Sequence, residues 1–309
     1  MTMEQVVIGT RGSALALAQA ELTETALGMA FPALQVVREI IKTTGDRRTD
    51  VALSQVAKVE GVLDKGVFTK ELELALEAGT IDLAVHSLKD VPTVLADHFA
   101  IAGVLERAPI RDVLVTKVPG GLDTLPAGAT VGTSSVRRAK QLLWLRPDLE
   151  VIDLRGNVPT RLSKVAGEDY DAIMLAEAGL VRLGHDLSKT ELVDDVELHF
   201  APLAEEVFYP AAGQGAVGFE IRADDADAVA IVKAINHPAT FVRVTAEREF
   251  LRLLEGGCHT PVGVFTALDG GLITMQARVF PEQGGEPRTG KAEGCDPLEV
   301  AKELFESLA

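Results

Sequence analysis

The sequence has few of the features that mark disulfide-bonded, secreted or membrane-spanning proteins. Among its 309 residues are two cysteines, Cys258 and Cys295, which are too few for a disulfide framework and typical of a reducing cytoplasm. No uninterrupted apolar run approaches the roughly 20 residues that a membrane-spanning helix needs. The first residues have no basic stretch followed by an apolar one, so we expect no signal peptide. These absences predict a soluble cytoplasmic protein.

Positive charge is also scarce. The chain has 30 Lys and Arg against 46 Asp and Glu, a formal net charge of −16, so we expect neither nucleic acid nor an anionic membrane as partner. Its six histidines and two cysteines show no recognised ligand spacing, which predicts no metal site. Neither a Walker A motif nor a G-x-G-x-x-G sequence after a strand is present, which disfavours nucleotide phosphate.

Strand and helix signals alternate through the first two thirds of the chain and predict two α/β units. In the first, a strand ends at Thr10, a helix capped by Ser13 runs to about Met29, and another strand covers about 34–41. Residues 43–66 lack periodicity and predict a long loop, followed by a helix at 70–79 and a strand at 81–85. The second unit covers about 111–200. The remainder predicts an α+β domain with two helices, two strands joined at Gly270-Gly271 and a final helix.

Arginines gather at three predicted strand-to-helix turns. A helix N-terminus is already partly positive, so a guanidinium group there opposes the helix unless an anion completes the arrangement. Arginine grips planar carboxylates bidentately, and the carboxyl ends of the strands are where α/β sheets bind ligands. We interpret the turns as a site for a small molecule with several carboxylates. The alternative is that each arginine pairs with a surface carboxylate. The turns carry Arg11, then Arg137 and Arg138, then Arg155 and Arg161.

Three further residues are candidates for chemistry, and each has a plainer alternative. Asp90 follows a buried strand and is a candidate acid, base or counter-ion to a cationic substrate; with Lys89 it also fits an exposed ion pair. Cys258 lies in a glycine-rich turn, where a thiol is presented to a cavity, although a lone cysteine is more often a small buried apolar residue. Phe68 fits either an aromatic face beside the site or a hydrophobic staple that starts a helix.

The ordered series of these segments resembles the hydroxymethylbilane synthase family, also called porphobilinogen deaminase, over nearly the whole chain. Each segment alone is moderate evidence, whereas their order in one chain is specific. The matching segments include IGTRGS at 8–13, KGVFTKELE at 65–73, AVHSLKDVP at 84–92, VGTSSVRR at 131–138, LRGN at 154–157, GQGA at 213–216 and LEGGC at 254–258.

The resemblance implies an α/β fold with two domains like type II periplasmic binding proteins, joined by a hinge, and a C-terminal α+β domain. The implied domains are 1–105 with 206–222, 110–201, and 223–309. It also implies a dipyrromethane cofactor, joined to Cys258 by a thioether. In the implied reaction, a monomeric enzyme condenses four porphobilinogen molecules onto this primer, with release of ammonia and then of linear hydroxymethylbilane.

The resemblance also assigns roles to residues. Asp90 is the implied catalytic carboxylate, and Lys65 and Phe68 belong to a loop that closes over the site. The residues implied to hold substrate are Arg11, Ser13, Gln19, Arg155, Gly156, Arg161 and Arg182. Those implied to hold the cofactor are Ser87, Lys89, Thr133, Ser134, Ser135, Arg137, Arg138 and Gln214.

The chain departs from the family pattern near Lys65, where residues 58–66 contain an apparent insertion, and in the inter-domain strand before Asp112. Two other functions remain open at this point. One is a non-catalytic binding module for a dicarboxylate or oxyanion. The other is a thiol-dependent enzyme in which His259 assists Cys258. A stable organic group on Cys258 separates the implied enzyme from both.

Overall fold

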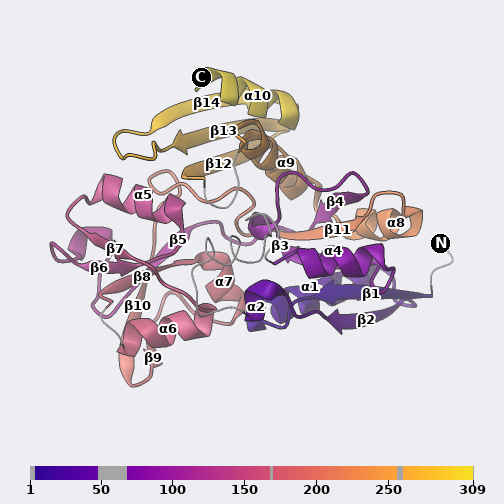
Figure 1. Cartoon of the computed structure of the whole chain (residues 1–309), viewed down its shortest axis with the longest axis horizontal. Helices are drawn as coiled ribbons and strands as arrows, with labels where there is room; N and C mark the ends of the chain where they lie inside the picture. The colour runs from indigo at the N-terminus through magenta and orange to yellow at the C-terminus, as the bar shows by residue number, and fades with distance from the viewer. Residues whose placement is uncertain (1–3, 48–67, 168–169, 256–259, 309) are drawn as a thin grey trace. The chain divides into compact units, whose positions relative to one another are not determined.

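The computed structural model describes residues 4–47, 68–167, 170–255 and 260–308, and these divide into two compact units (Figure 1). Unit 1 comprises Met1–Ala108 and Gly215–Thr245, and unit 2 comprises Pro109–Gln214 and Ala246–Ala309. The chain therefore contributes two separate segments to each unit. Each unit is described by itself below.

Unit 1 is built on a five-stranded mixed sheet in the order β2-β1-β3-β11-β4. Strands β1, β2 and β3 are parallel, and β11 is antiparallel to both of its neighbours. The register pairs Ile8 with Leu83, so the carboxyl ends of β1 and β3 lie at one edge of the sheet. The strands are β1 (Gln5–Thr10), β2 (Gln35–Ile40), β3 (Leu83–Ser87), β4 (Phe99–Val104) and β11 (Val217–Arg222).

Helices cover both faces of this sheet. Apolar residues of α1 (Ala14–Ala30) and α8 (Ala226–Ile235) pack with Ile8, Val85 and Phe219 in one core cluster. On the opposite face, α4 (Lys70–Glu77) buries Leu72 and Leu76. The alternation of side chains along each strand separates the two clusters. Ser13 caps α1 by accepting the Ala16 N–H at 3.3 Å, as the sequence predicts.

Unit 2 contains a six-stranded sheet in the order β7-β6-β8-β5-β10-β9. Here β7, β6 and β8 are parallel, and β5 is antiparallel to β8 and β10. Helix α5 packs on one face, and helices α6 and α7 pack on the other. The elements are β5 (Asp112–Thr116), η2 (Leu122–Thr124), β6 (Thr130–Gly132), α5 (Val136–Leu145), β7 (Glu150–Ile152), α6 (Val158–Gly167), β8 (Ala172–Ala176), α7 (Glu177–Arg182), β9 (Glu191–Val193) and β10 (Val196–Pro202).

The two α/β sheets share one strand order. In each, the second, first and third parallel strands are followed by an antiparallel strand from another part of the chain and then by a further strand. Unit 1 takes β11 in that position, and unit 2 takes β5. The α/β fold class with two similar sheets is therefore confirmed. The domain boundaries that the resemblance implies stay a prediction.

The C-terminal region forms a separate antiparallel sheet in the order β12-β13-β14, which contacts α10. Gly270 and Gly271 join β12 to β13 with φ values of 53° and 88°, the left-handed conformation that a tight hairpin requires. The prediction of two strands is wrong, because Arg288–Gly294 forms a third. The elements are α9 (Pro238–Leu253), β12 (Val262–Asp269), β13 (Leu272–Val279), β14 (Arg288–Gly294) and α10 (Pro297–Ser307).

The predicted loop at 43–66 is only partly described. Thr44–Arg47 form the short helix α2, so the prediction is wrong for those residues, and 48–66 lie outside the described residues. The N-terminus of α2 is held from α4: Glu71 Oε1 accepts hydrogen bonds of 2.7 Å from both the N–H and the hydroxyl of Thr44. Among the described helices, none is long and apolar enough to cross a membrane.

Candidate functional site

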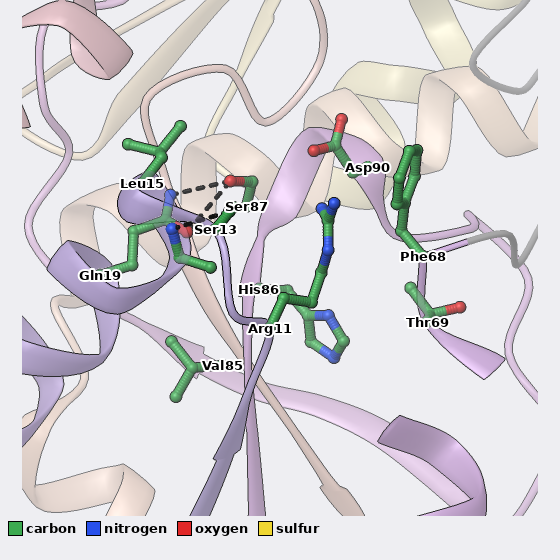
Figure 2. Close-up of a pocket in the computed structure, with 11 residues that line it drawn as sticks. Arg11, Ser13, Leu15, Gln19, Phe68, Thr69, Val85, His86, Ser87 and Asp90 are labelled. Carbon is green, nitrogen blue, oxygen red and sulfur yellow. Dashed lines mark hydrogen bonds between the residues drawn. The ribbon is translucent and has the colours of Figure 1, made fainter. Parts of the chain in front are cut away.

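A pocket lies in unit 1 at the carboxyl ends of β1 and β3 (Figure 2). Because these strands are parallel neighbours, the residues that follow them meet at the same edge of the sheet. Arg11 follows β1, and Asp90 ends the short helix η1 (Leu88–Asp90) that follows β3. The lining residues are Arg11, Ser13, Leu15, Ala16, Gln19, Phe68, Thr69, Val85, His86, Ser87 and Asp90.

One wall of the pocket is fixed by a reciprocal pair of hydrogen bonds. The Gln19 amide donates to Ser87 Oγ at 2.8 Å, and the Ser87 hydroxyl donates to Gln19 Oε1 at 3.1 Å. Gln19 is buried in α1. The pair therefore ties the helix after β1 to the end of β3.

The opposite wall joins an arginine to an aromatic ring. The guanidinium carbon of Arg11 lies 4.1 Å from the centroid of the Phe68 ring, and in Figure 2 the Arg11 side chain points toward Phe68 and Asp90. Behind the ring, Gly45 allows close approach: a Cβ built there would lie 2.1 Å from the Phe68 ring. Gly45 is needed at this position because any side chain would displace the ring.

Asp90 is anchored by the residue two places before it. Leu88 is fully buried, its N–H donates to the Ala216 carbonyl at 3.1 Å, and its side chain packs against Gly218 so closely that a Cβ there would lie 2.8 Å away. Asp90 itself is half-buried and lines the pocket. Its carboxylate therefore faces the pocket from a segment held by the core.

A buried ionisable pair includes His86, which is one of the residues that line this pocket. His86 Nε2 is 2.8 Å from Glu220 Oε2, with side-chain exposures of 4% and 0%. Both residues lie on the α4 face of the sheet, where burial raises the pKa of Glu73 above its usual value and Glu220 adds to that effect. The pair joins β11 to β3, the strand that leads into the candidate catalytic segment.

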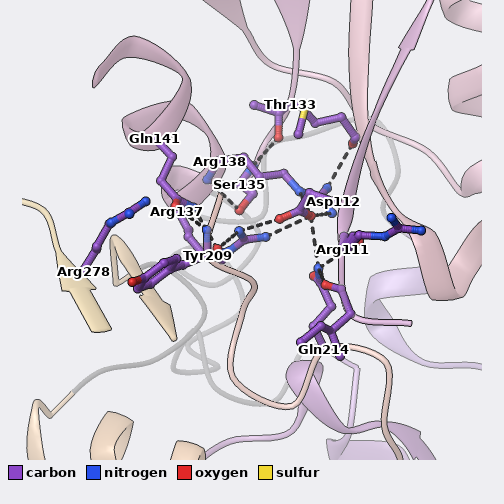
Figure 3. Close-up of polar contacts among 12 residues, drawn as sticks. Arg111, Asp112, Thr133, Ser135, Arg137, Arg138, Gln141, Tyr209, Gln214 and Arg278 are labelled. Atoms are coloured by element: carbon purple, nitrogen blue, oxygen red, sulfur yellow. Dashed lines mark hydrogen bonds and ion pairs between the residues drawn. The ribbon is translucent and has the colours of Figure 1, made fainter. Parts of the chain in front are cut away.

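In unit 2, three predicted cofactor residues converge on a buried carboxylate (Figure 3). Asp112 accepts hydrogen bonds from Arg137 Nη1 at 2.6 Å and from Arg138 Nε at 2.8 Å. Gln214 Nε2 lies 3.2 Å from the same carboxylate. The two guanidinium groups hold the pKa of Asp112 far below its usual range, despite its complete burial. The anion that the arginine turn requires is thus supplied, in part, by the protein itself.

The turn before α5 is ordered by its hydroxyl groups. Ser135 caps the helix by accepting the Arg138 N–H at 3.4 Å, and Thr133 Oγ1 accepts the Ser135 N–H at 3.2 Å. The Ser134 hydroxyl donates to the Leu154 carbonyl in the turn after β7. The backbone of Arg137 and Arg138 is therefore held in place at the capped N-terminus of α5.

The turn after β7 has a backbone that needs glycine. Gly156 has φ +118°, and a Cβ there would lie 2.7 Å from Thr160. Its carbonyl accepts a hydrogen bond of 2.8 Å from Arg161 Nε, while Arg155 is half-buried one residue earlier. After β8, burial lowers the pKa of Arg182 to about 10. All three arginines follow parallel strands of one sheet.

The structure thus places the predicted residues in two groups. Arg11, Ser13, Gln19, Phe68, Ser87 and Asp90 line the unit 1 pocket; Arg137, Arg138 and Gln214 surround Asp112 in unit 2. Lys89 is half-buried beside Asp90 and is not a lining residue of the pocket. Lys65 and Cys258 lie outside the described residues. The assignment of these side chains to substrate or cofactor stays a prediction.

Sequence reasoning missed Asp112 and the pair of His86 with Glu220. A signal for Asp112 exists, because it is a charged residue directly before the apolar run Val113-Leu114-Val115. The pair offered none, since its members are 134 residues apart. Within the described part of the chain, no group of three or more His, Cys, Asp or Glu side chains is arranged to hold a metal ion.

These features define a class: an α/β protein with two similar sheets, arginines after the parallel strands, and an arginine and an aspartate in one pocket. Two family models match the chain, "Porphobilinogen deaminase, dipyromethane cofactor binding domain" at residues 6–230 and "Porphobilinogen deaminase, C-terminal domain" at 241–309. The chain belongs to the porphobilinogen deaminase family. The family resemblance, the assignment as a transferase and the implied dipyrromethane cofactor are confirmed, and the function of the family is hydroxymethylbilane synthesis.

Known porphobilinogen deaminases are similar in sequence to this chain over almost its full length. Porphobilinogen deaminase of Moorella thermoacetica is 44% identical over 308 residues, covering 99% of this chain and 93% of the relative. That of Desulforudis audaxviator is 46% identical over 305 residues, with coverage of 99% and 93%. Among solved structures, the methionine binding protein MetQ aligns with a TM-score of 0.45 at 14% identity, covering 77% of this chain and 92% of MetQ.

Proposed function

We propose that this chain condenses four porphobilinogen molecules into linear hydroxymethylbilane, with Asp90 as the catalytic carboxylate and Arg11 as a substrate carboxylate ligand. One observation carries the proposal. Arg11 and Asp90, which follow two adjacent parallel strands, line the same pocket. A cationic group and an anionic group in one pocket match a substrate that has carboxylates and an aminomethyl group.

Asp90 acts on the aminomethyl carbon of the substrate. When the carbon–nitrogen bond of the protonated aminomethyl group breaks, nitrogen leaves as ammonia with the bonding electrons, and the positive charge passes to the pyrrole. A carboxylate about 4 Å away in an effective dielectric near 20 stabilises that charge by about 4 kcal/mol. This corresponds to roughly a thousandfold in rate. Asp90 also accepts and returns the pyrrole N–H proton, since its carboxylate faces the pocket.

The arginines bind the acetate and propionate groups of the substrate and the growing chain. Each added pyrrole brings two carboxylates, so a guanidinium partner is needed repeatedly. Arg11 serves this role in unit 1, with Ser13 and Gln19 beside it. In unit 2 the role falls to Arg155, Arg161 and Arg182, with Gly156 setting the backbone of the turn after β7.

The residues around Asp112 fit the dipyrromethane group. Guanidinium and hydroxyl donors suit its carboxylates, and Arg137 Nε is a buried donor with no hydrogen-bond partner among the described residues. When bound, the group supplies the nucleophilic α-carbon of a terminal pyrrole. Its carboxylates are held by Arg137, Arg138 and Thr133, with Ser134, Ser135, Ser87, Lys89 and Gln214 as further ligands, and Cys258 is the attachment point.

The proposal also covers the compartment, the oligomeric state and nucleic-acid binding. We infer that the protein is a cytoplasmic monomer without a nucleic-acid partner. A net charge of −16 opposes nucleic acid, and two cysteines suit a reducing compartment. Light scattering coupled to gel filtration tests the monomer, for which the expected mass is 32.8 kDa plus the cofactor.

The intact denatured mass of the purified protein tests the function, measured beside a Cys258→Ala variant. Added mass equal to two pyrrole units in the wild type, and none in the variant, supports the proposed enzyme. An unmodified wild type that stays unmodified after incubation with porphobilinogen supports the binding module instead. A shift in mass that persists in Cys258→Ala contradicts attachment at this cysteine.

A further inference from the structure

Helix α2 begins at the same edge of the unit 1 sheet as the candidate substrate arginine. The register pairs Thr10 at the end of β1 with Ile40 at the end of β2, and the Ile41 N–H donates to the Thr10 carbonyl at 2.8 Å. Arg11 follows β1, and α2 begins at Thr44, shortly after β2. Because the two strands are parallel neighbours, the segments that follow them lie at one edge of the sheet.

Helix α4 and the turn before it hold the start of α2 at two points. Glu71 Oε1 accepts hydrogen bonds of 2.7 Å from both the N–H and the hydroxyl of Thr44. Phe68, which precedes α4, packs against Gly45, where a Cβ would lie 2.1 Å from the ring. The two contacts fall on successive residues of α2, so the hydrogen bonds from Thr44 to Glu71 set how closely Gly45 approaches the ring.

The position of Glu71 is itself fixed by the core of unit 1. Its neighbour Leu72 is fully buried, as is Leu76 one turn later, and both belong to one core cluster. The Glu73 N–H donates to the Thr69 carbonyl at 2.9 Å, which closes the first turn of α4 around Glu71. The carboxylate therefore extends from a helix that is anchored independently of α2.

Within the described residues, Glu71 uses its carboxylate for Thr44 alone. Its second oxygen, Oε2, is buried and has no hydrogen-bond partner in the described part of the chain. Hydrogen bonds to an ionised acceptor are roughly twice as strong as those between neutral groups. Glu71 is not among the residues that line the pocket, so any effect on the site passes through other side chains.

The ring that packs against Gly45 also contacts Arg11. The guanidinium carbon of Arg11 lies 4.1 Å from the centroid of the Phe68 ring, and Figure 2 shows the two side chains next to each other in the pocket. If the bonds to Glu71 are lost, the start of α2 can move away from Phe68. The ring then loses the packing that keeps it against the guanidinium.

We propose that Glu71 is a positioning residue for Arg11. Its carboxylate holds Thr44, and through Thr44 it keeps Gly45 packed against the Phe68 ring. The ring in turn orients the Arg11 guanidinium. This inference rests on the proposed function, in which Arg11 binds a substrate carboxylate. A purely structural role of Glu71 predicts instead a loss of stability, with unchanged kcat/KM in every variant that folds.

Three variants of the full chain and one control separate these roles. Glu71→Leu removes the acceptor, whereas Glu71→Gln keeps an oxygen that accepts both bonds. Thr44→Val removes one of the two donors and leaves α4 unchanged. Glu77→Leu, at the exposed last residue of α4, makes the same chemical change at the other end of the helix. Circular dichroism establishes the temperature range in which each variant is folded, and kcat/KM for porphobilinogen is then measured with and without Phe68→Leu.

We expect kcat/KM to fall about fivefold in Glu71→Leu and about twofold in Thr44→Val, because each loosens the contact between ring and guanidinium. Glu71→Gln and Glu77→Leu are expected to stay close to the wild-type value. In the Phe68→Leu background, the further loss from Glu71→Leu is expected to be below about twofold, since the ring through which it acts is gone.

Wild-type kcat/KM in folded Glu71→Leu overturns the proposal, and so does a loss of equal size with and without the Phe68 ring. An equal loss in Glu71→Gln and Glu71→Leu also overturns it, because glutamine keeps the acceptor. If Glu71→Leu does not fold, Thr44→Val decides: wild-type kcat/KM in this variant overturns the proposal, and a loss that disappears in the Phe68→Leu background supports it.

Hydrogen exchange at the peptide that contains Thr44 tests the contact without any turnover. The Thr44 N–H is expected to exchange about tenfold faster in Glu71→Leu than in the wild type, because it loses its acceptor. Equal exchange in the two proteins overturns the hold of Glu71 on α2. If the wild type turns over no porphobilinogen while exchange responds as expected, the proposed function fails rather than this contact.

Discussion

The guanidinium group of Arg11 stacks on the ring of Phe68, with 4.1 Å between the guanidinium carbon and the ring centroid. Phe68 is the first described residue after the segment 48–67, and Arg11 follows β1. A cation on an aromatic face gains about 0.5–2 kcal/mol, depending on its exposure to water. The ring therefore helps to hold the arginine that we assign to the substrate.

A double-mutant cycle on Arg11 and Phe68 tests this contact. Phe68→Leu keeps an apolar side chain but removes the aromatic face, so Arg11 loses its orienting partner and kcat/KM falls. Once Arg11 is leucine, the further loss from Phe68→Leu is expected to be smaller. The coupling is expected to be about 0.5–1 kcal/mol in kcat/KM for porphobilinogen. Independent, additive effects contradict the contact.

Gly45→Ala tests whether the packing position of the Phe68 ring matters for activity. Its Cβ would lie 2.1 Å from the Phe68 ring, so the ring must move away from its position over Arg11. We expect kcat/KM to fall about fivefold or more, which corresponds to the loss of a contact worth about 1 kcal/mol. Wild-type kcat/KM in a variant with normal circular dichroism contradicts this role of Phe68.

Gly28→Ala is the matched glycine control in the same unit. Gly28 lies inside α1, and a Cβ there would meet nothing within 4 Å. Alanine restricts the unfolded chain and suits a helix, so we expect stability to rise by about 0.4–1 kcal/mol with unchanged turnover. Urea unfolding measures the change, and a loss of stability contradicts the open space at this site.

Asp90→Ala is expected to keep the fold and to lose nearly all ammonia release. Removal of the carboxylate forfeits the stabilisation of about 4 kcal/mol, so turnover falls roughly a thousandfold. Asp97→Ala, at an exposed position that precedes β4, is the matched control and is expected to turn over normally. Near-normal ammonia release by Asp90→Ala, measured with a coupled assay, excludes the catalytic role.

The half-buried Glu73 predicts a pH-dependent change in stability. Burial raises the pKa of Glu73, so the folded state binds its proton more tightly than the unfolded state does. Ionised Glu73 therefore lowers stability above its folded pKa, and this penalty is absent below the unfolded value of about 4.3. Glu73→Gln is expected to stabilise the protein at pH 7.5 by up to about 0.5 kcal/mol, given solvent screening.

The gain from Glu73→Gln is expected to shrink as the pH approaches about 4.3. Urea unfolding at pH 7.5, 6 and 5 measures this slope. Glu77→Gln, on the exposed side of α4, controls for the loss of a charge from the same helix. An equal effect of both substitutions at every pH contradicts the raised pKa.

Local rules predicted most elements because their signals lie close together in the sequence. Ser13 before an Ala/Leu-rich run predicted α1 and its cap, and Gly270-Gly271 predicted the hairpin of β12 and β13. The same rules failed for Arg288–Gly294, which forms β14. That strand has little apolar alternation, and its pairing with β13 rather than its own composition makes it a strand.

Site residues that lie in sequence motifs could be predicted, whereas residues that belong to the site only through contacts in the folded structure could not. Arg11 and Asp90 were identified from strand ends and from the family resemblance, and the structure places both in one pocket. Asp112 was not identified, because its place in the site depends on hydrogen bonds from two arginines that lie 25 and 26 residues further along the chain. The ion pairs of this buried cluster form only when distant parts of the chain meet in the fold, so they are not seen in the order of the residues.

The placement of β11 governs when unit 1 can fold. This strand lies between β3 and β4 in the sheet, yet it comes from Val217–Arg222, more than a hundred residues after them in the chain. During synthesis β3 and β4 emerge early and must wait, with their facing edges unpaired, until residue 222 of 309 has left the ribosome. Unpaired strand edges favour aggregation. The position of β11 in the chain therefore leaves these two strand edges exposed through much of translation.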